Sequence, residues 1–307
     1  MLLLIQSKTS PATVESCISS LRQDDAQERW EAAEGLGYLT DPLAVDALIG
    51  ALADPHPFVR WQAGQALGRI ASRLRRRAPG APVLRIFRPE VQIPSLLECL
   101  APLVEDPLGH VRAATADALG ELRLASGLLL LLRLLDDQDD SVRASAAVAL
   151  GKLRSKKATG ALIVLLSDDS EWVRKSAVEA LGAIGGVDAS RALTEELKDP
   201  NPMIRASATA ALGHCTESGV TKVLVDALED EHPQVRWHAA CGLGFVGNIT
   251  AVPYLEQMRQ DDAVVFSTPI ADVAQEAIRL IRRRHRGLWN TIRRLIHSIK
   301  VEIKKQM

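Results

Sequence analysis

Asp-Pro-His-Pro-Phe-Val-Arg, residues 54–60, is followed by an alanine-rich segment that ends in Leu67-Gly68. The same order returns in residues 230–236, Asp-Glu-His-Pro-Gln-Val-Arg, and it again leads to Leu-Gly. The arginine of this motif recurs at intervals of 31 residues, at Arg29, Arg60, Arg112, Arg143, Arg174, Arg205 and Arg236. Only the step from Arg60 to Arg112 is longer, by 21 residues. A fixed period in this range indicates stacked structural repeats.

Each repeat is expected to form two antiparallel helices. The first is short and apolar, as in residues 43–52, 128–135, 161–166 and 220–228. A turn, often with proline, separates it from a second helix that runs from about the arginine to the glycine. The glycine is interpreted as a helix stop, and no segment alternates clearly enough to predict a strand. We therefore predict an all-α fold, a right-handed α-solenoid of stacked antiparallel helix pairs.

A second residue follows the same period. An aspartate stands six positions before the arginine from the second repeat onward, at Asp54, Asp106, Asp137, Asp168, Asp199 and Asp230. Because an arginine fork suits a carboxylate, these residues are expected to form a ladder between neighbouring turns of the stack. A pair that recurs throughout the repeats is a structural element and does not distinguish a functional site.

These motifs, with their alanine-rich helices, resemble HEAT repeats, and specifically the short HEAT-like repeats of the phycobilin (phycobilisome) lyase family. The resemblance covers roughly residues 12–281. It implies a solenoid whose second helices line a concave groove. HEAT-like proteins include scaffolds, chromophore lyases, lyase-like degradation factors and a metal-dependent hydroxylase family, so the resemblance implies the fold more strongly than the function.

We expect one solenoid over residues 1–286, with seven clear repeats and a degenerate eighth, and a separate C-terminal segment over residues 287–307. In the eighth repeat Ala274 replaces the arginine, after about seven extra residues. The apolar spacing of the C-terminal segment predicts a basic amphipathic helix, which caps the stack or docks on a partner or an anionic membrane. Its candidate contact residues are Trp289, Arg293 and Arg294.

The 21 extra residues fall near positions 71–91 and are strongly basic, with Arg75, Arg76 and Arg77 as candidate contact residues. Four prolines and glycines in this insertion argue against a continuous helix through it. Two interpretations stay open, a basic arm that grips an acidic partner and a solvated, mobile loop.

Tryptophans break the regularity of the repeat. Trp30, Trp61 and Trp237 directly follow the repeat arginine, where the middle repeats carry Ala113, Ala144 and Ala206. A helical wheel directs this position away from the core, and Trp172, two residues before its arginine, lies near the same arc. These tryptophans are predicted to contact a partner in the groove, although each could instead pack over the neighbouring repeat.

His238 and Cys241 stand one helical turn apart beside Trp237, and we include them among the candidate contact residues. A metal site is not predicted there, because only two ligands share a face and the four cysteines show no CxxC spacing. No catalytic residue and no cofactor is predicted.

The sequence therefore favours a non-catalytic interaction scaffold that binds a partner protein, through an acidic or helical segment, in the groove. The alternative is a bilin or tetrapyrrole lyase-like protein, which the resemblance supports. The hydroxylase type is disfavoured, because that family uses His-Glu dipeptides and this chain has none. A net charge of −1 makes nucleic acid an unfavourable partner. Free cysteines and the absence of a long apolar segment predict a cytoplasmic protein, and peripheral membrane contact through residues 287–307 stays open as one alternative.

Overall fold

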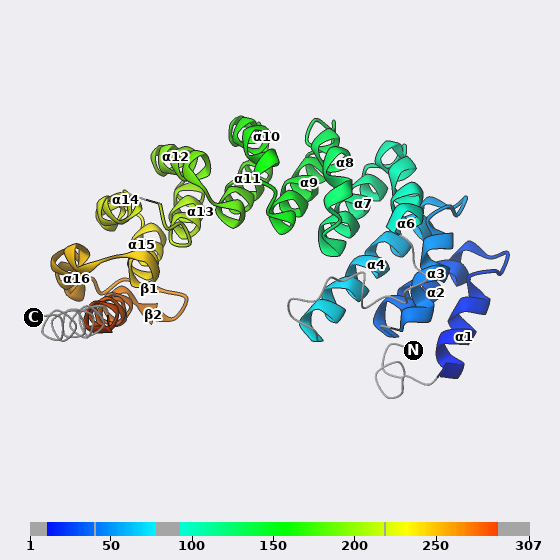
Figure 1. The fold of residues 1–307 in the computed structure, drawn as a ribbon, viewed down its shortest axis with the longest axis horizontal. Helices are drawn as coiled ribbons and strands as arrows, with labels where there is room; N and C mark the ends of the chain where they lie inside the picture. Colours follow the sequence, from blue (N-terminus) through cyan, green and yellow to red (C-terminus); the bar gives the residue numbers. More distant parts are fainter. Residues whose placement is uncertain (1–10, 40, 78–92, 218, 288–307) are drawn as a thin grey trace, which may run out of the picture. The chain divides into compact units, whose positions relative to one another are not determined.

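The computed structural model describes residues 11–39, 41–77, 93–217 and 219–287. Contacts group the chain into two compact units, with Ala180 as the last residue of the first and Leu181 as the first of the second. Helices follow one another in stacked pairs (Figure 1), which confirms the predicted all-α solenoid. Within the described residues, no helix combines the length and apolarity that a membrane crossing requires. The expected boundary at residue 287 stays a prediction.

The first unit contains the helix pairs of the first repeats. Its α-helices are α1 (Pro11–Ser20), α2 (Ala26–Leu39), α3 (Pro42–Ala51), α4 (Pro57–Arg77), α6 (Ile93–Leu100), α7 (Gly109–Leu122), α8 (Leu128–Leu134), α9 (Asp140–Leu153) and α10 (Thr159–Val164), and it ends within α11 (Glu171–Ile184). Short 3-10 helices lie between them, η2 (Ala101–Glu105), η3 (Ala125–Gly127), η4 (Lys156–Ala158) and η5 (Leu165–Ser167).

The second unit continues the pattern. It contains α12 (Val187–Glu195), η6 (Glu196–Lys198), α13 (Pro202–Leu212), α14 (Val220–Asp226), η7 (Ala227–Glu229), α15 (Pro233–Val246), η8 (Ile249–Ala251), α16 (Val252–Gln257) and η9 (Met258–Gln260). A helix also covers residues 270–287. This helix and α16 lie where the degenerate eighth repeat is predicted, and Ala274 in this helix is fully buried.

Second helices of successive repeats pack directly on one another. In the first unit α2 packs on α4, α4 on α7 and α7 on α9, and in the second unit α13 packs on α15. First helices such as α3, α8 and α14 cover their own second helix. The core between them consists of leucine, alanine, valine and isoleucine, as the small number of aromatic residues predicts.

The prediction that the repeat glycine stops the second helix is confirmed for α13, where Gly213 is the C-cap, but it is wrong for the other second helices. Helix α7 continues past Gly120, and a Cβ added to Gly120 would stand 2.7 Å from both Cα and Cβ of Ala149, one repeat later. Equivalent approaches join Gly37 to Ala66, Gly151 to Ala180, Gly182 to Ala211 and Gly213 to Gly242. The repeat therefore requires glycine because the backbone of the next second helix lies against it.

The predicted ladder is confirmed within each unit. Arg143 donates from Nε and Nη2 to the two carboxylate oxygens of Asp168, at 2.7 and 2.8 Å, and from Nη1 to the carbonyl oxygen of Asp137. Arg60 likewise contacts the Asp106 carboxylate. The same two-pronged contact joins Arg29 to Asp54, Arg112 to Asp137, Arg205 to Asp230 and Arg236 to Asp261. Each of these arginines thus connects its own repeat to the next one.

The expectation that the chain has no strand is also wrong at one place. The extra residues of the eighth repeat form a small antiparallel hairpin, with β1 (Val264–Val265) paired to β2 (Thr268–Pro269). Its two turn residues, Phe266 and Ser267, adopt positive φ angles of 50° and 62°. Strands of two residues are too short to produce a recognisable alternation in the sequence.

Candidate partner-binding surface

Large apolar side chains recur at the start of the second helices, two residues before the repeat arginine. In the first unit this position holds Phe58, 53% exposed, and Trp172, 54% exposed, and in the second unit it holds Met203, 41% exposed. Each of these residues is the second residue of its helix. These three repeats therefore present apolar surface at this edge, because the valine or isoleucine that follows is the residue that turns into the core.

In the first unit, aromatic rings from two repeats meet at this edge. The ring of His110, on α7, stacks on Phe58, on α4, with ring centres 5.3 Å apart and an angle of 13°. Trp61 meets the same imidazole edge-on, with the ring centres 6.3 Å apart. We call Phe58, Trp61 and His110 the first aromatic cluster. The Nε2 atom of His110 is buried without a hydrogen-bond partner.

In the second unit, the hairpin brings an aromatic ring to the repeat tryptophan. The Phe266 ring lies 5.3 Å from Trp237 and 6.2 Å from His238, edge-on to both. Trp237 and His238 also contact each other edge-on, at 5.0 Å. We call these three residues the second aromatic cluster. Phe266 keeps 64% of its surface exposed, whereas Trp237 is half-buried and its Nε1 has no hydrogen-bond partner.

The helical-wheel assignment of the position after the arginine needs correction. Ala144 and Ala206, at this position, are 1% and 3% exposed, so the position does not uniformly face solvent. Within each unit, neighbouring second helices pack on one another, as α9 does on α7 and α13 on α15, and cover each other's flanks. Trp30, on α2, is half-buried in the same way. Tryptophans at this position thus both pack against the stack and contribute part of their surface to the outside.

The thiol and imidazole of the second unit show no sign of a metal centre. Burial lowers the pKa of His238 and raises the pKa of the Cys241 thiol to about 11, so the thiol is protonated at neutral pH. A thiol in this state is a poor ligand and a poor nucleophile. Among the described residues, no group of three histidine, cysteine or carboxylate side chains is arranged to hold a metal ion.

Two arginines of the helix over residues 270–287 have structural partners. Arg284 donates to the carbonyl oxygens of Gly244, Phe245 and Gly247 at the end of α15, and Arg282 pairs with Glu256. These two arginines therefore fix the last helix on the seventh and eighth repeats.

The predicted basic insertion begins in a helix. Arg75, Arg76 and Arg77 form the end of α4, where the side chain of Arg76 is exposed. The expected interruption of the helix by Pro79 lies outside the described residues. The rest of the insertion lies outside the described residues, as do the candidate contact residues Trp289, Arg293 and Arg294.

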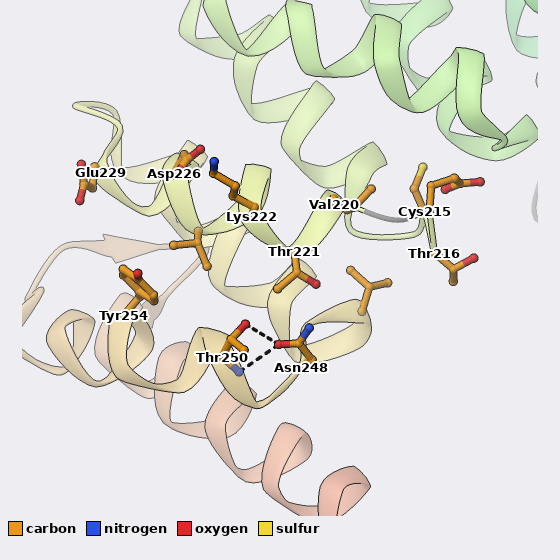
Figure 2. Close-up of a pocket in the computed structure, with 14 residues that line it drawn as sticks. Cys215, Thr216, Val220, Thr221, Lys222, Asp226, Glu229, Asn248, Thr250 and Tyr254 are labelled. Carbon is orange, nitrogen blue, oxygen red and sulfur yellow. Dashed lines mark hydrogen bonds between the residues drawn. The ribbon is translucent and has the colours of Figure 1, made fainter. Parts of the chain in front are cut away.

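A hollow of about 670 Å³ lies in the second unit beside α14 (Figure 2). Lys222, Asp226 and Tyr254 contribute to its lining. Its polar groups mainly serve the backbone, since the Asn248 side chain accepts hydrogen bonds from the Thr250 amide and hydroxyl at the start of η8. The lining contains both acidic and basic side chains, but they do not form the arrangement of acid, base and nucleophile that catalysis requires.

Sequence analysis missed several residues of this surface. Phe58 stands inside the motif of residues 54–60, at the same position of its repeat as Trp172, and this shared position was the available signal. Phe266 lies among the seven extra residues of the eighth repeat, and the interruption of the period there was the available signal. His110 gave no signal, since only the packing of α4 on α7 brings it to Phe58.

Comparisons with known proteins support the repeat architecture. Solved structures similar to this chain include YIBA_ECOLI of Escherichia coli, with a TM-score of 0.54 and 20% identity over 88% of this chain and 92% of that one. An engineered protein aligns with a TM-score of 0.46 and 22% identity over 74% and 93% of the two chains. Human deoxyhypusine hydroxylase in complex with glycerol aligns with a TM-score of 0.37 and 19% identity over 89% and 96%. The last two similarities carry no argument about this chain, and the first concerns the fold alone.

No curated protein matches the sequence. HEAT repeats, in contrast, match residues 14–88, 81–150, 127–196 and 190–271. Repeats of this kind form extended stacks that generally serve as protein-interaction scaffolds. The match does not extend to the phycobilin lyase subgroup. With nearly the whole described chain covered by these repeats, the protein belongs to the HEAT repeat family.

Proposed function

We propose that the protein is a non-catalytic interaction scaffold that binds an apolar or helical segment of a partner protein along the face formed by its second helices. The observation that carries this proposal is the recurrence of Phe58, Trp172 and Met203 at one position of the repeat, each more than 40% exposed. Isolated apolar residues are common on protein surfaces, but recurrence at one position of the repeat, twice in the first unit and once in the second, provides exposed anchor residues at equivalent edges of their helices.

The two aromatic clusters support the same proposal. Aromatic side chains contribute most to binding energy where they are partly prepacked, because little conformational entropy is then lost on binding. Phe266 fits this description, since Trp237 and His238 hold one side of its ring while the other side faces solvent. Its backbone adopts a conformation that costs an aromatic residue about 1 kcal/mol, and such strain is typical of functional positions.

Binding of a bilin or another tetrapyrrole has no comparable support. The hollow beside α14 is polar and open, whereas a flat ring needs an apolar pocket. Docking of residues 287–307 on the partner or on an anionic membrane remains part of the proposal, as a contact separate from the aromatic clusters.

Affinity capture from the native cell, followed by mass spectrometry, tests the proposal. Phe58→Ser and Phe266→Asn each remove one exposed ring, and asparagine tolerates the turn conformation of Phe266. We expect each variant to lose at least about tenfold of the captured partner, which corresponds to about 1.4 kcal/mol of binding energy. Deletion of residues 288–307 tests the tail separately.

Leu129→Ser is the matched control, because Leu129 is 76% exposed but lies on a first helix, α8. This control should capture the partner as the wild type does. Equal losses in all three variants, or no loss in any of them, would contradict a binding face on the second helices. Turnover of a small molecule by the purified protein would contradict the non-catalytic assignment.

A further inference from the structure

The Arg69 guanidinium has two buried donor atoms that no carboxylate in the described structure accepts from. It lies on α4, nine residues after the repeat arginine, and its guanidinium stacks on the ring of Tyr38, with Cζ 5.2 Å from the ring centre. Its Nε and Nη2 atoms are buried and have no hydrogen-bond partner. Buried charged donors that lack an acceptor cost considerable free energy, and native proteins usually pair them.

The arginines of the ladder show which group the Nε and Nη2 atoms of a guanidinium bind in this fold. In Arg29, Arg112 and Arg143 the Nε and Nη2 atoms together grip both oxygens of an aspartate. Arg69 presents the same two atoms without a carboxylate. The pKa values follow this difference, since the aspartate bond raises the pKa of Arg143, whereas burial lowers the pKa of Arg69.

Neighbouring carboxylates make no hydrogen bond to Nε or Nη2 of Arg69. Residues nine positions after the repeat arginine meet their counterparts in the next repeat, as Glu121 meets Lys152 at 2.7 Å. Glu121 follows Arg69 in this row, but its carboxylate is taken by the lysine. Glu34, on α2, raises the pKa of Arg69 by its charge but makes no hydrogen bond to it.

Further positive charge continues along the same face of α4. Arg73 and Arg76 stand four and seven residues after Arg69, which places the three on one side of the helix. Arg73 also lies over Tyr38, 5.4 Å from the ring centre, and donates to the Tyr38 carbonyl oxygen. A row of arginines at this spacing attracts several negative charges at once, which suits a segment of acidic residues better than a single small anion.

We propose that Arg69 is a receptor for a carboxylate of an acidic segment in the partner protein, with Arg73 and Arg76 guiding the segment along α4. The inference rests on the proposed scaffold function and specifies one contact of the partner. The guanidinium of Arg69 lies close to α2, because a Cβ added to Gly37 would stand 3.1 Å from Nε of Arg69. Binding therefore turns the guanidinium outward on its flexible side chain, a change that is common at interfaces.

Fluorescence anisotropy with a dye-labelled hexaglutamate peptide and the full chain tests this proposal. The wild type should bind the peptide, and Arg69→Met should weaken binding by at least about tenfold, as loss of a two-pronged charged contact predicts. Arg69→Lys keeps the charge without the fork and should bind with intermediate affinity. Arg22→Met removes the same charge from an exposed position and should change affinity by less than about twofold.

Thermal unfolding of the same proteins separates binding from folding. Arg69→Met should leave the Tm unchanged or raise it, because an unmatched buried charge is removed, while Arg143→Met should lower it. An equal fall in both would overturn the proposal, since Arg69 would then stabilise the stack itself. Absence of peptide binding by the wild type, equal binding by Arg69→Met, or Arg69-dependent binding only to phosphatidylserine vesicles would overturn it as well. Phe58→Ser leaves Arg69 intact, so failure of the aromatic face and failure of this site are distinguishable.

Discussion

Arg143 and Asp168 illustrate how single residues hold successive repeats together. The side chains are only 17% and 11% exposed, and the arginine reaches the carboxylate of the next repeat and a carbonyl oxygen of its own turn. The carboxylate also accepts the backbone N–H of Ser170. Every polar group of this joint therefore has a partner, which is the condition under which a partly buried ion pair stabilises a fold.

This arrangement predicts acid sensitivity. The hydrogen-bonded Arg143 lowers the pKa of Asp168, against the opposing effect of burial, and Arg236 lowers the pKa of Asp261 in the same way. Because these folded-state pKa values lie below the unfolded value of about 3.9, the stabilisation is complete above that pH. It is lost as the pH falls below about 4 through the folded values. Denaturant unfolding between pH 3 and 7 should therefore give a free energy of unfolding that drops below about pH 4.

Asp168→Asn tests the contribution of one carboxylate. It should lower the free energy of unfolding at pH 7 by about 1–3 kcal/mol and make the acid-induced fall less steep. The control is Asp169→Asn, at the exposed neighbouring position, which should retain the wild-type profile. Identical pH profiles for the two variants would be inconsistent with a stabilising ladder.

At the scale of the element, the contact between second helices depends on the repeat glycine. Glycine inside a helix is unfavourable by about 1 kcal/mol relative to alanine, so its retention in α7 needs a structural reason. That reason is the backbone of α9, which leaves no space for a methyl group at Gly120.

Gly120→Ala should therefore destabilise the protein by about 1–3 kcal/mol despite the better helix propensity, because the two backbones must separate. Gly50→Ala is the matched control, since Gly50 also lies inside a helix, α3, but has no atom within 4 Å of an added Cβ. It should stabilise the protein by about 0.5–1 kcal/mol. Chemical denaturation of the two variants measures both effects, and the same sign for both would contradict the close-approach explanation.

At the scale of the whole molecule, an open stack of repeats needs a covered end. In the second unit the helix over residues 270–287 supplies this cover, with Ile270, Ala277 and Ile281 at most 2% exposed. Arg284 joins the same helix to the end of α15. The basic character of this segment thus partly reflects capping.

Deletion of residues 270–307 should expose this apolar surface, lower the Tm by about 5–10 °C and increase the fluorescence of a hydrophobic dye. Deletion of residues 288–307 alone keeps all of these contacts and should have the smaller effect. Thermal scans of both truncated proteins provide the comparison. Equal Tm values for the two would show that the described helix does not cap the stack.

Much of the fold was predictable from the sequence, because a repeat exposes the same residue to the same environment many times. The aspartate, the arginine and the small residues of the second helices therefore indicated their own roles, although the glycine was assigned the wrong one. The candidate surface was less predictable. Trp61 and Trp237 were identified as exceptions to the repeat, but their partners His110 and Phe266 come from other parts of the stack, and only packing brings them to the tryptophans.

The sequence by itself determined the helix pairs, their period and the ladder, since these follow from local spacing and from one carboxylate and one guanidinium per turn. Beyond the ladder, only the tertiary structure decided which side chains of neighbouring repeats meet. It placed the Phe266 ring against Trp237 and the backbone of α9 against Gly120. It also left Nε and Nη2 of Arg69 without a hydrogen-bonded carboxylate. The physical reason is that such contacts depend on how closely neighbouring helices approach, which the residues of one repeat do not specify alone.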